Sequence, residues 1–124
     1  MTEFEMVGDR VERARMFFDA GDFITASRML GELVAEMPDD LELRLLLARA
    51  YYHSAQLGRA ERELRVVLER DPVADYAHLL LGRTLQRQSR HDEALKYLRL
   101  AEAMSGFGVD SERPLPGSPI PQDL

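Results

Sequence analysis

The chain has 124 residues, of which 45% are hydrophobic and 31% charged, with a formal net charge of −6. This length suits one domain with a buried core, and the negative charge opposes general nucleic-acid binding, because phosphate contacts need positive potential. There is no cysteine, which excludes disulfides and thiolate chemistry. The apolar runs are too short to span a membrane, and the acidic start lacks the pattern of a signal peptide, so we expect a cytoplasmic protein.

Helical patterns follow one another along the chain, separated by short polar breaks. Apolar residues recur at helical spacing within them, as Ala60, Leu64 and Val67 do at i, i+4 and i+7. Pro38 and Pro72 stand where one helical pattern ends and the next begins, which suits the preference of proline for the first turn of a helix. The pattern predicts helices at about 4–20, 23–36, 40–54, 57–70, 73–88 and 91–105.

The helical patterns form pairs that repeat every 34 residues, the interval between Pro38 and Pro72. Four more columns keep this interval: Ala14, Ala48 and Gly82; Phe17, Tyr51 and Leu85; Ala26, Ala60 and Ala94; Leu30, Leu64 and Leu98. Five columns in one register predict three stacked units of one length, at about 7–40, 41–74 and 75–108.

These columns resemble the tetratricopeptide-repeat family, whose pattern is Leu-Gly and Tyr in a first helix, then Ala, an aromatic residue or Leu, and a closing Pro. The resemblance covers about residues 7–106, with departures: there is no Trp, Arg13 stands where Leu is usual, and Gly106 stands where a third Pro would fall. The resemblance implies an all-α fold over residues 1–106, a right-handed α-solenoid of three antiparallel helix pairs.

The stretch LRLLLARAYY, residues 43–52, is apolar on nearly every side, although a surface helix should have a polar face. Its place in the middle unit explains this, because its helix has neighbours in both directions. Small residues at Ala48 and Gly82 would let the second helix of each pair approach closely.

One stripe of each first helix is left over after this packing. In the middle unit it is Leu45, Arg49 and Tyr52, spaced i, i+4 and i+7. By resemblance, this stripe lines the concave groove in which the family binds extended peptides or partner helices. The groove residues so predicted are Val11, Arg15, Phe18, Leu45, Arg49, Tyr52, Leu79, Arg83 and Gln86, with His53 and Arg87 at the rim.

Arg15, Arg49 and Arg83 form a row at the 34-residue interval. An apolar floor with three guanidinium groups would suit a segment that carries carboxylates and a few apolar side chains. An equally weighted alternative is that each Arg folds onto a nearby acid and only keeps the groove soluble. The acids within reach along the chain are Glu12, Asp19 and Glu42.

Nothing in the chain has the spacing of a catalytic or metal site. His53, His78 and His91 have no i, i+3 or i+4 partner among themselves, and GFG at 106–108 follows a helical pattern instead of opening one. Ser, His and Asp are present, but no pattern places them as a triad. We therefore expect no enzyme, no cofactor and no metal.

The C-terminal segment 107–124 is rich in proline, with four prolines among its last eleven residues. Proline at this density forbids a helix and predicts a disordered tail or extended polyproline II. Two alternatives remain: the tail folds back over Leu95 and Leu98, or it is a ligand for a groove of another protein.

The leading functional hypothesis is a protein-interaction scaffold or adaptor that binds a peptide or helix of a partner protein in its groove. One alternative is a regulatory or assembly subunit that self-associates through the solenoid ends, as a homodimer would. RNA binding through the Arg row is a weaker alternative, since helical-repeat proteins can read single strands but this chain is short and acidic.

Overall fold

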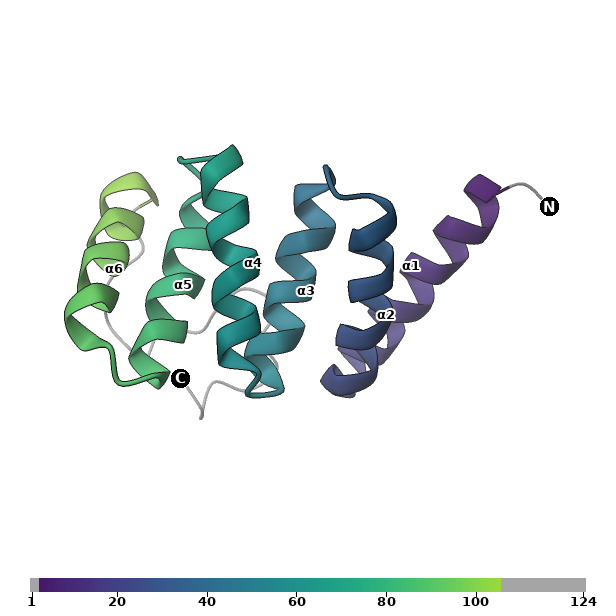
Figure 1. Cartoon of the computed structure of the whole chain (residues 1–124), viewed down its shortest axis with the longest axis horizontal. Coiled ribbons are helices and arrows are strands. Elements are labelled where there is room, and N and C mark those ends of the chain that lie inside the picture. Colours follow the sequence, from purple (N-terminus) through teal and green to yellow (C-terminus); the bar gives the residue numbers. More distant parts are fainter. Residues whose placement is uncertain (1–2, 106–124) are drawn as a thin grey trace.

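The computed structural model describes residues 3–105 of the protein, and these residues form six helices (Figure 1). The helices are α1 (Glu3–Asp19), α2 (Phe23–Glu36), α3 (Leu41–His53), α4 (Leu57–Arg70), α5 (Asp75–Arg87) and α6 (His91–Ser105). No strand occurs in this part of the chain. The six predicted helices are confirmed, with ends shifted by at most two residues, as in the third (41–53 against 40–54) and the fifth (75–87 against 73–88).

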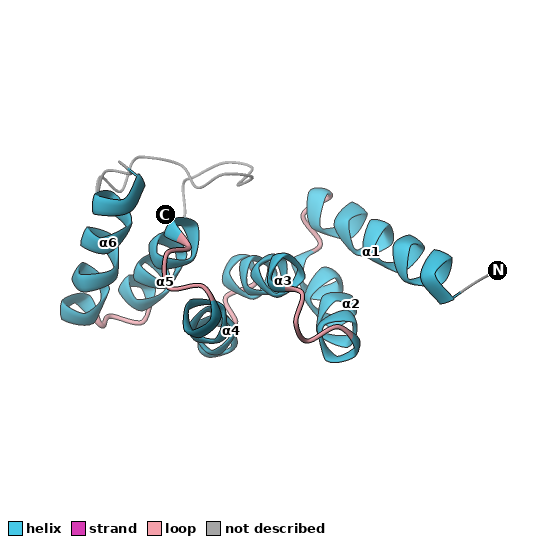
Figure 2. Ribbon diagram, turned by 90° about the horizontal axis from the view of Figure 1, so that it is seen from above, coloured by secondary structure: helices cyan, strands magenta, loops and turns pink. Residues whose placement is uncertain are grey.

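Each helix packs against the next one in the chain, and α3 also contacts α5. The helices stand side by side as three antiparallel pairs, α1–α2, α3–α4 and α5–α6 (Figure 1). Seen from above, α2 and α4 lie on the same side of α3 (Figure 2). This arrangement is the predicted all-α solenoid. The predicted tail and the last residues of the third unit fall outside the described residues, so those boundaries stay predictions.

The turn inside each pair has the same backbone geometry. Gly21, Ala55 and Ser89 lie 34 residues apart, and their φ angles are 84°, 61° and 62°. In each turn the N–H of the following residue donates to the carbonyl five residues earlier, at 2.8–2.9 Å. This is the Schellman ending of a helix, which places one residue in the left-handed region. Glycine takes that conformation without strain, whereas Ala55 and Ser89 adopt it at some cost.

Only some of the helices begin with a side chain that accepts a hydrogen bond from a backbone N–H of the first turn. The carboxylates of Asp22 and Asp40 accept the backbone N–H three residues on, at 3.1 and 3.0 Å, and so fix the starts of α2 and α3. Gln56 and Ala74, which precede α4 and α5, make no side-chain cap bond. The starts of those two helices therefore depend on packing.

The core consists of two apolar clusters that meet at α3. Leu43, Leu46 and Leu47 belong to the cluster shared with α1 and α2, while Ala48 and Tyr52 belong to the cluster shared with α4, α5 and α6. A helix that contributes to both clusters must carry apolar residues on most of its sides. This is the physical reason why residues 43–52 are apolar nearly all round.

In the last pair, α5 approaches α6 closely at Gly82. A Cβ atom there would sit 2.6 Å from Leu98 Cδ2 and 3.3 Å from the carbonyl oxygen of Ala94, both on α6. Only glycine fits at that separation. The predicted role of a small residue at this position is therefore confirmed by the geometry.

Candidate protein-interaction face

The eleven predicted groove residues all lie on α1, α3 and α5, the first helices of the three pairs. We call the side of these helices that carries them the inner face. Their exposure differs widely. Arg15 is exposed, whereas Val11, Leu45, Arg49, His53, Gln86 and Arg87 are half-buried. Phe18, Tyr52, Leu79 and Arg83 are buried, with exposed fractions of 5%, 0%, 2% and 2%. These four support the face more than they form its surface.

Arg49 joins the three helices of the inner face. Its Cζ lies 4.8 Å from the ring centroid of Phe18 on α1 and 5.9 Å from that of Tyr76 on α5. A guanidinium between two rings gains cation–π attraction and is held in one place while its edge can still donate hydrogen bonds. The middle arginine of the row is therefore oriented by its neighbours.

The surroundings of Tyr76, including Arg49, change the pKa of its phenol. Burial raises the pKa of its phenol, and the positive charge and hydrogen bond of Arg49 act in the opposite direction without cancelling the effect of burial. The phenol therefore stays neutral across the physiological range. Tyr76 therefore contacts the Arg49 guanidinium as a neutral hydrogen-bonding group and adds no negative charge there.

Aromatic side chains gather where α1, α2 and α3 meet. The rings of Phe23 and His53 stack at a centroid distance of 4.7 Å, and Phe18 meets Phe23 edge-on at 5.1 Å. His53 also meets Phe18 and Tyr52 edge-on, at 6.1 and 5.4 Å. Such pairs have specific geometry and contribute beyond area burial, so His53 is a fixed part of the face.

Arg87 links α5 to this aromatic group. Its Nη1 donates to the backbone carbonyl of Tyr52 at 2.8 Å, and its Cζ lies 4.7 Å from the Tyr52 ring centroid. Because Tyr52 itself is buried, Arg87 covers part of it; the place of Arg87 at the rim of a groove stays a prediction.

The acids considered as alternative partners for the Arg row are not engaged with it. Glu12, Asp19 and Glu42 form no ion pair within residues 3–105, and Arg15 likewise forms none there. Intramolecular neutralisation by these three acids is therefore absent from the described part of the chain.

Comparison with known proteins identifies the family. A family model described as tetratricopeptide repeat matches residues 17–83, more than half of the chain. The chain belongs to the tetratricopeptide-repeat family. This membership supports a general role as a protein-interaction scaffold.

Solved structures of MamA share the fold. One MamA mutant superposes with a TM-score of 0.76 at 17% identity, covering 80% of this chain and 72% of that one. A second mutant gives a TM-score of 0.75 at 19% identity, covering 83% and 57%. MamA from Desulfovibrio magneticus RS-1 gives a TM-score of 0.72 at 21% identity, covering 78% and 55%. At these identities the likeness shows the fold alone, and two of the three MamA chains extend well beyond the part matched here.

Two residues that contact the inner face, Tyr76 and Phe23, were missed by the sequence pattern of the tetratricopeptide repeat. Tyr76 stands three residues before Leu79, so extending the stripe by one helical turn would have found it. Phe23 is the first residue of α2 and reaches His53 only because the first pair packs against α3. No periodicity in the chain could have indicated that contact.

Within residues 3–105 no three His, Cys, Asp or Glu side chains come together as a metal site would require. None of the helices in the same part of this tetratricopeptide-repeat protein combines the length and apolar character needed to cross a membrane.

Proposed function

We propose that this protein is a cytoplasmic scaffold or adaptor that binds a peptide or helix of a partner protein in a concave groove on its inner face. The observation that carries the proposal is Arg49, which lies between Phe18 and Tyr76 and so connects all three first helices at one oriented cation. Half-buried Leu45 and Val11 on the same face offer apolar contact. The partner segment is acidic, with at least one large apolar side chain.

The expected energetics are compatible with a regulated, reversible complex. A charge-assisted hydrogen bond to an arginine contributes roughly 1.5–3 kcal/mol where water is excluded. Two such bonds and one buried aliphatic side chain contribute roughly 5–9 kcal/mol before the cost of ordering a flexible segment is subtracted, so we expect a Kd that is micromolar or weaker. The acidic chain as a whole disfavours polyanions at long range, so recognition is by contact at the arginines.

The test compares partner capture by the unaltered protein, by Arg49→Ala and by Arg62→Ala. Arg62 is a matched control, because it is an exposed arginine on α4, away from the inner face. Partners bound through the groove are lost with Arg49→Ala and kept with Arg62→Ala, and purified partner segments then bind Arg49→Ala at least tenfold more weakly. The helical circular dichroism of both variants should equal that of the parent. Equal capture by all three proteins removes Arg49 from the function.

A second candidate, self-association through the solenoid ends, is favoured by the exposed apolar side chains of the terminal helices. Met6 and Met16 on α1 are 50% and 68% exposed, and Leu95 on α6 is 41% exposed. An α1 face of one copy against an α6 face of the next would bury them. Sedimentation equilibrium at several concentrations tests this: association that Met16→Glu abolishes supports it, and a monomer at every concentration ends it.

A further inference from the structure

The 34-residue repeat gives two equivalent sets of three helices. We call the set in which α3, as the floor helix, packs against α2 and α4 the first cleft, and the set in which α5, as the floor helix, packs against α4 and α6 the second cleft. Residues that differ by 34 in number occupy the same position in the two clefts. The side chains at each pair of equivalent positions can therefore be compared directly.

The first cleft is closed by ionic contacts. Arg44 Nη1 donates to Glu63 Oε1 at 2.6 Å, and its Nη2 donates to the carbonyl of Pro38 at 3.0 Å. Nearer the end of the cleft, Arg70 Nη1 donates to Asp39 Oδ1 at 3.0 Å and to the Pro38 carbonyl at 2.9 Å. Two arginines thus join α3 and α4 to each other and to the segment that follows α2.

The second cleft carries apolar and aromatic residues at the same positions. His78 and Tyr97 replace the pair Arg44–Glu63. His78 Nε2 keeps the bond to the proline carbonyl, here Pro72 at 2.9 Å, and its ring stacks on Tyr97 at 6.0 Å between centroids. Met104 and Val73 replace the second ion pair of the first cleft and are 40% and 73% exposed. Neither ionic bridge of the first cleft is therefore present in the second, whose outer helices are joined instead by the ion pair of Arg65 and Glu93 at 3.6 Å.

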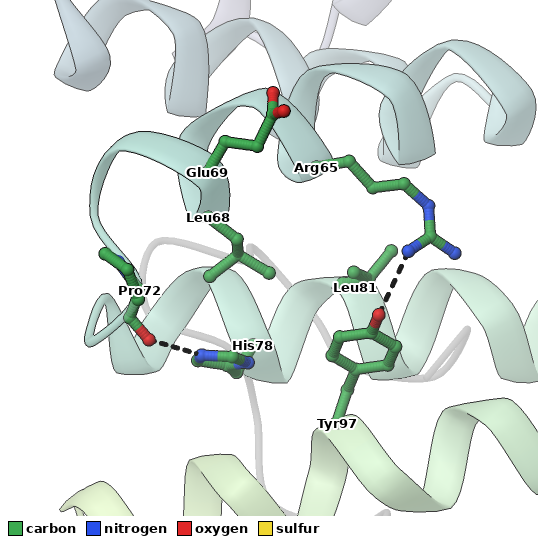
Figure 3. A pocket seen from close by; sticks show the side chains of 7 residues that line it. All are labelled: Arg65, Leu68, Glu69, Pro72, His78, Leu81 and Tyr97. Carbon is green, nitrogen blue, oxygen red and sulfur yellow. Dashed lines mark hydrogen bonds between the residues drawn. The ribbon is translucent and has the colours of Figure 1, made fainter.

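The result is a cavity of about 470 Å³ in the second cleft (Figure 3). Its apolar surface comes from Leu68 of α4, Leu81 of α5 and Pro72, with Tyr97 at one side. A volume of this size accommodates a large apolar side chain together with part of the segment that carries it. Val73 and Met104, which occupy the positions of Asp39 and Arg70 in the first cleft, add exposed apolar side chains to the second, as is usual for protein–protein contact sites.

Charges of both signs lie at this cavity: Lys96 Nζ is 5.5 Å from the ring centroid of Tyr97, while Arg65 and Glu69 belong to the lining. Arg65 is already engaged, because its Nε and Nη2 donate to Glu61 at 3.0 and 2.9 Å and its Nη1 donates to the Tyr97 hydroxyl at 3.0 Å. Glu69, one helical turn further along α4, is exposed and forms no ion pair within residues 3–105. Figure 3 shows its carboxylate turned outward, away from the floor of the cavity. A basic side chain that flanks the inserted residue could therefore pair with Glu69 at the outer edge of the cavity.

We propose that the second cleft is a docking site for a segment of another protein, one that inserts a large apolar side chain between Leu68, Leu81 and Tyr97 and places an adjacent Lys or Arg beside Glu69. The site is separate from the inner face and selects the opposite charge. One chain could in this way hold an acidic segment on its inner face and a basic, apolar segment on its outer side.

The experiment uses a phage-displayed library of random twelve-residue peptides, selected on the full chain. The enriched peptides are synthesised, and their Kd values are measured by fluorescence anisotropy on the parent protein and on three variants. His78→Arg/Tyr97→Glu copies the ionic pair of the first cleft into the second and replaces the aromatic side of the cavity with charged groups. Glu69→Arg reverses the rim charge on an exposed side chain. Arg49→Ala is the control on the inner face.

The expected peptides carry a large apolar residue next to Arg or Lys. Their affinity falls at least tenfold on the double variant and at least fivefold on Glu69→Arg, and it stays within twofold on Arg49→Ala. Glu69→Arg decides alone if circular dichroism shows that the double variant does not fold. The proposal is overturned if no enriched peptide responds to Glu69→Arg, or if the enriched peptides are lost only with Arg49→Ala. A dimer of the parent protein that Glu69→Arg dissociates would also overturn it, because a second copy would then fill the cleft.

Discussion

The two outer clefts of this solenoid have the same backbone and opposite side-chain character. The first is bridged by Arg44 to Glu63 and by Arg70 to Asp39, and the second carries a His78–Tyr97 stack and an apolar cavity. Both keep a bond from the floor helix to a proline carbonyl, so the frame is unchanged. A repeat fold thus sets where a cleft lies, and individual residues decide whether it is closed or able to bind.

Of the substitutions that test this comparison, Gly82→Ala should lower the free energy of unfolding most, through the second cleft. The added Cβ would stand 2.6 Å from Leu98 Cδ2 and 3.3 Å from the Ala94 carbonyl oxygen, so the buried Leu98 side chain, α6 or both have to shift. Overpacking of this kind costs about 3 kcal/mol at most, and we expect about 2–3 kcal/mol in the free energy of unfolding, measured with urea. Gly58→Ala is the control, since open space surrounds Gly58 and alanine favours the helix. Equal stability of the two variants would contradict the close approach.

Arg44→Met should destabilise the first cleft by about 2 kcal/mol. The substitution leaves Glu63 without its cation and the Pro38 carbonyl without a donor, while the apolar stem of the side chain is kept. The side chains of Arg44 and Glu63 are only 12% and 23% exposed, so water compensates poorly. Arg10→Met, which breaks the more exposed pair with Glu36, should change the urea midpoint little. If both variants lose the same stability, the first cleft is not sealed by its ion pair.

Low pH should weaken the contacts that Glu61 makes with Arg65 and Arg90 at the second cleft, because it protonates Glu61. Burial alone would raise the pKa of this carboxyl, but hydrogen bonds from Arg65 and Arg90 outweigh burial and hold the pKa below its usual value. A lowered folded-state pKa means that the group stabilises the fold above its unfolded pKa and that this contribution is lost as pH falls through the folded value. The urea midpoint of the parent protein should therefore fall between about pH 5 and pH 3.

Glu61→Gln is the matched variant for this pH dependence. It should be less stable than the parent at pH 7, and the difference should shrink toward pH 3, because protonation removes the advantage of the parent. A difference that stays constant over this range would show that Glu61 does not act through its charge.

Ser89→Gly should give the smallest change and the opposite sign. Ser89 adopts a φ of 62° in the turn that joins α5 to α6, the helices that form the floor and one wall of the second cleft. Glycine relieves this strain at some cost in unfolded-chain entropy, so we expect a gain of up to about 1 kcal/mol by thermal unfolding. Gly21→Ala, at the equivalent turn of the first pair, should lose a similar amount. A loss of stability in Ser89→Gly would mean that its side chain has another role.

The helices, their order and their pairing could be predicted from the sequence, because each depends on local periodicity and on a constant 34-residue interval. The stripe of Arg15, Arg49 and Arg83 could be assigned to one set of helices for the same reason. The solvent exposure of these three arginines could not be predicted in the same way. Arg15 is exposed and Arg83 is 2% exposed, although the two occupy the same place in their repeats, because burial depends on what packs over each helix.

Contacts between repeats were decided by the tertiary structure alone. The stacking of Phe23 on His53, the position of Arg49 between Phe18 and Tyr76, and the cavity beside Tyr97 each join residues of different helices. A periodic pattern states which residues share the face of one helix, and this follows from 3.6 residues per turn. Which faces meet, and how much space they leave, depends on the sizes and charges of side chains that are distant in the chain and are compared only when the repeats stack.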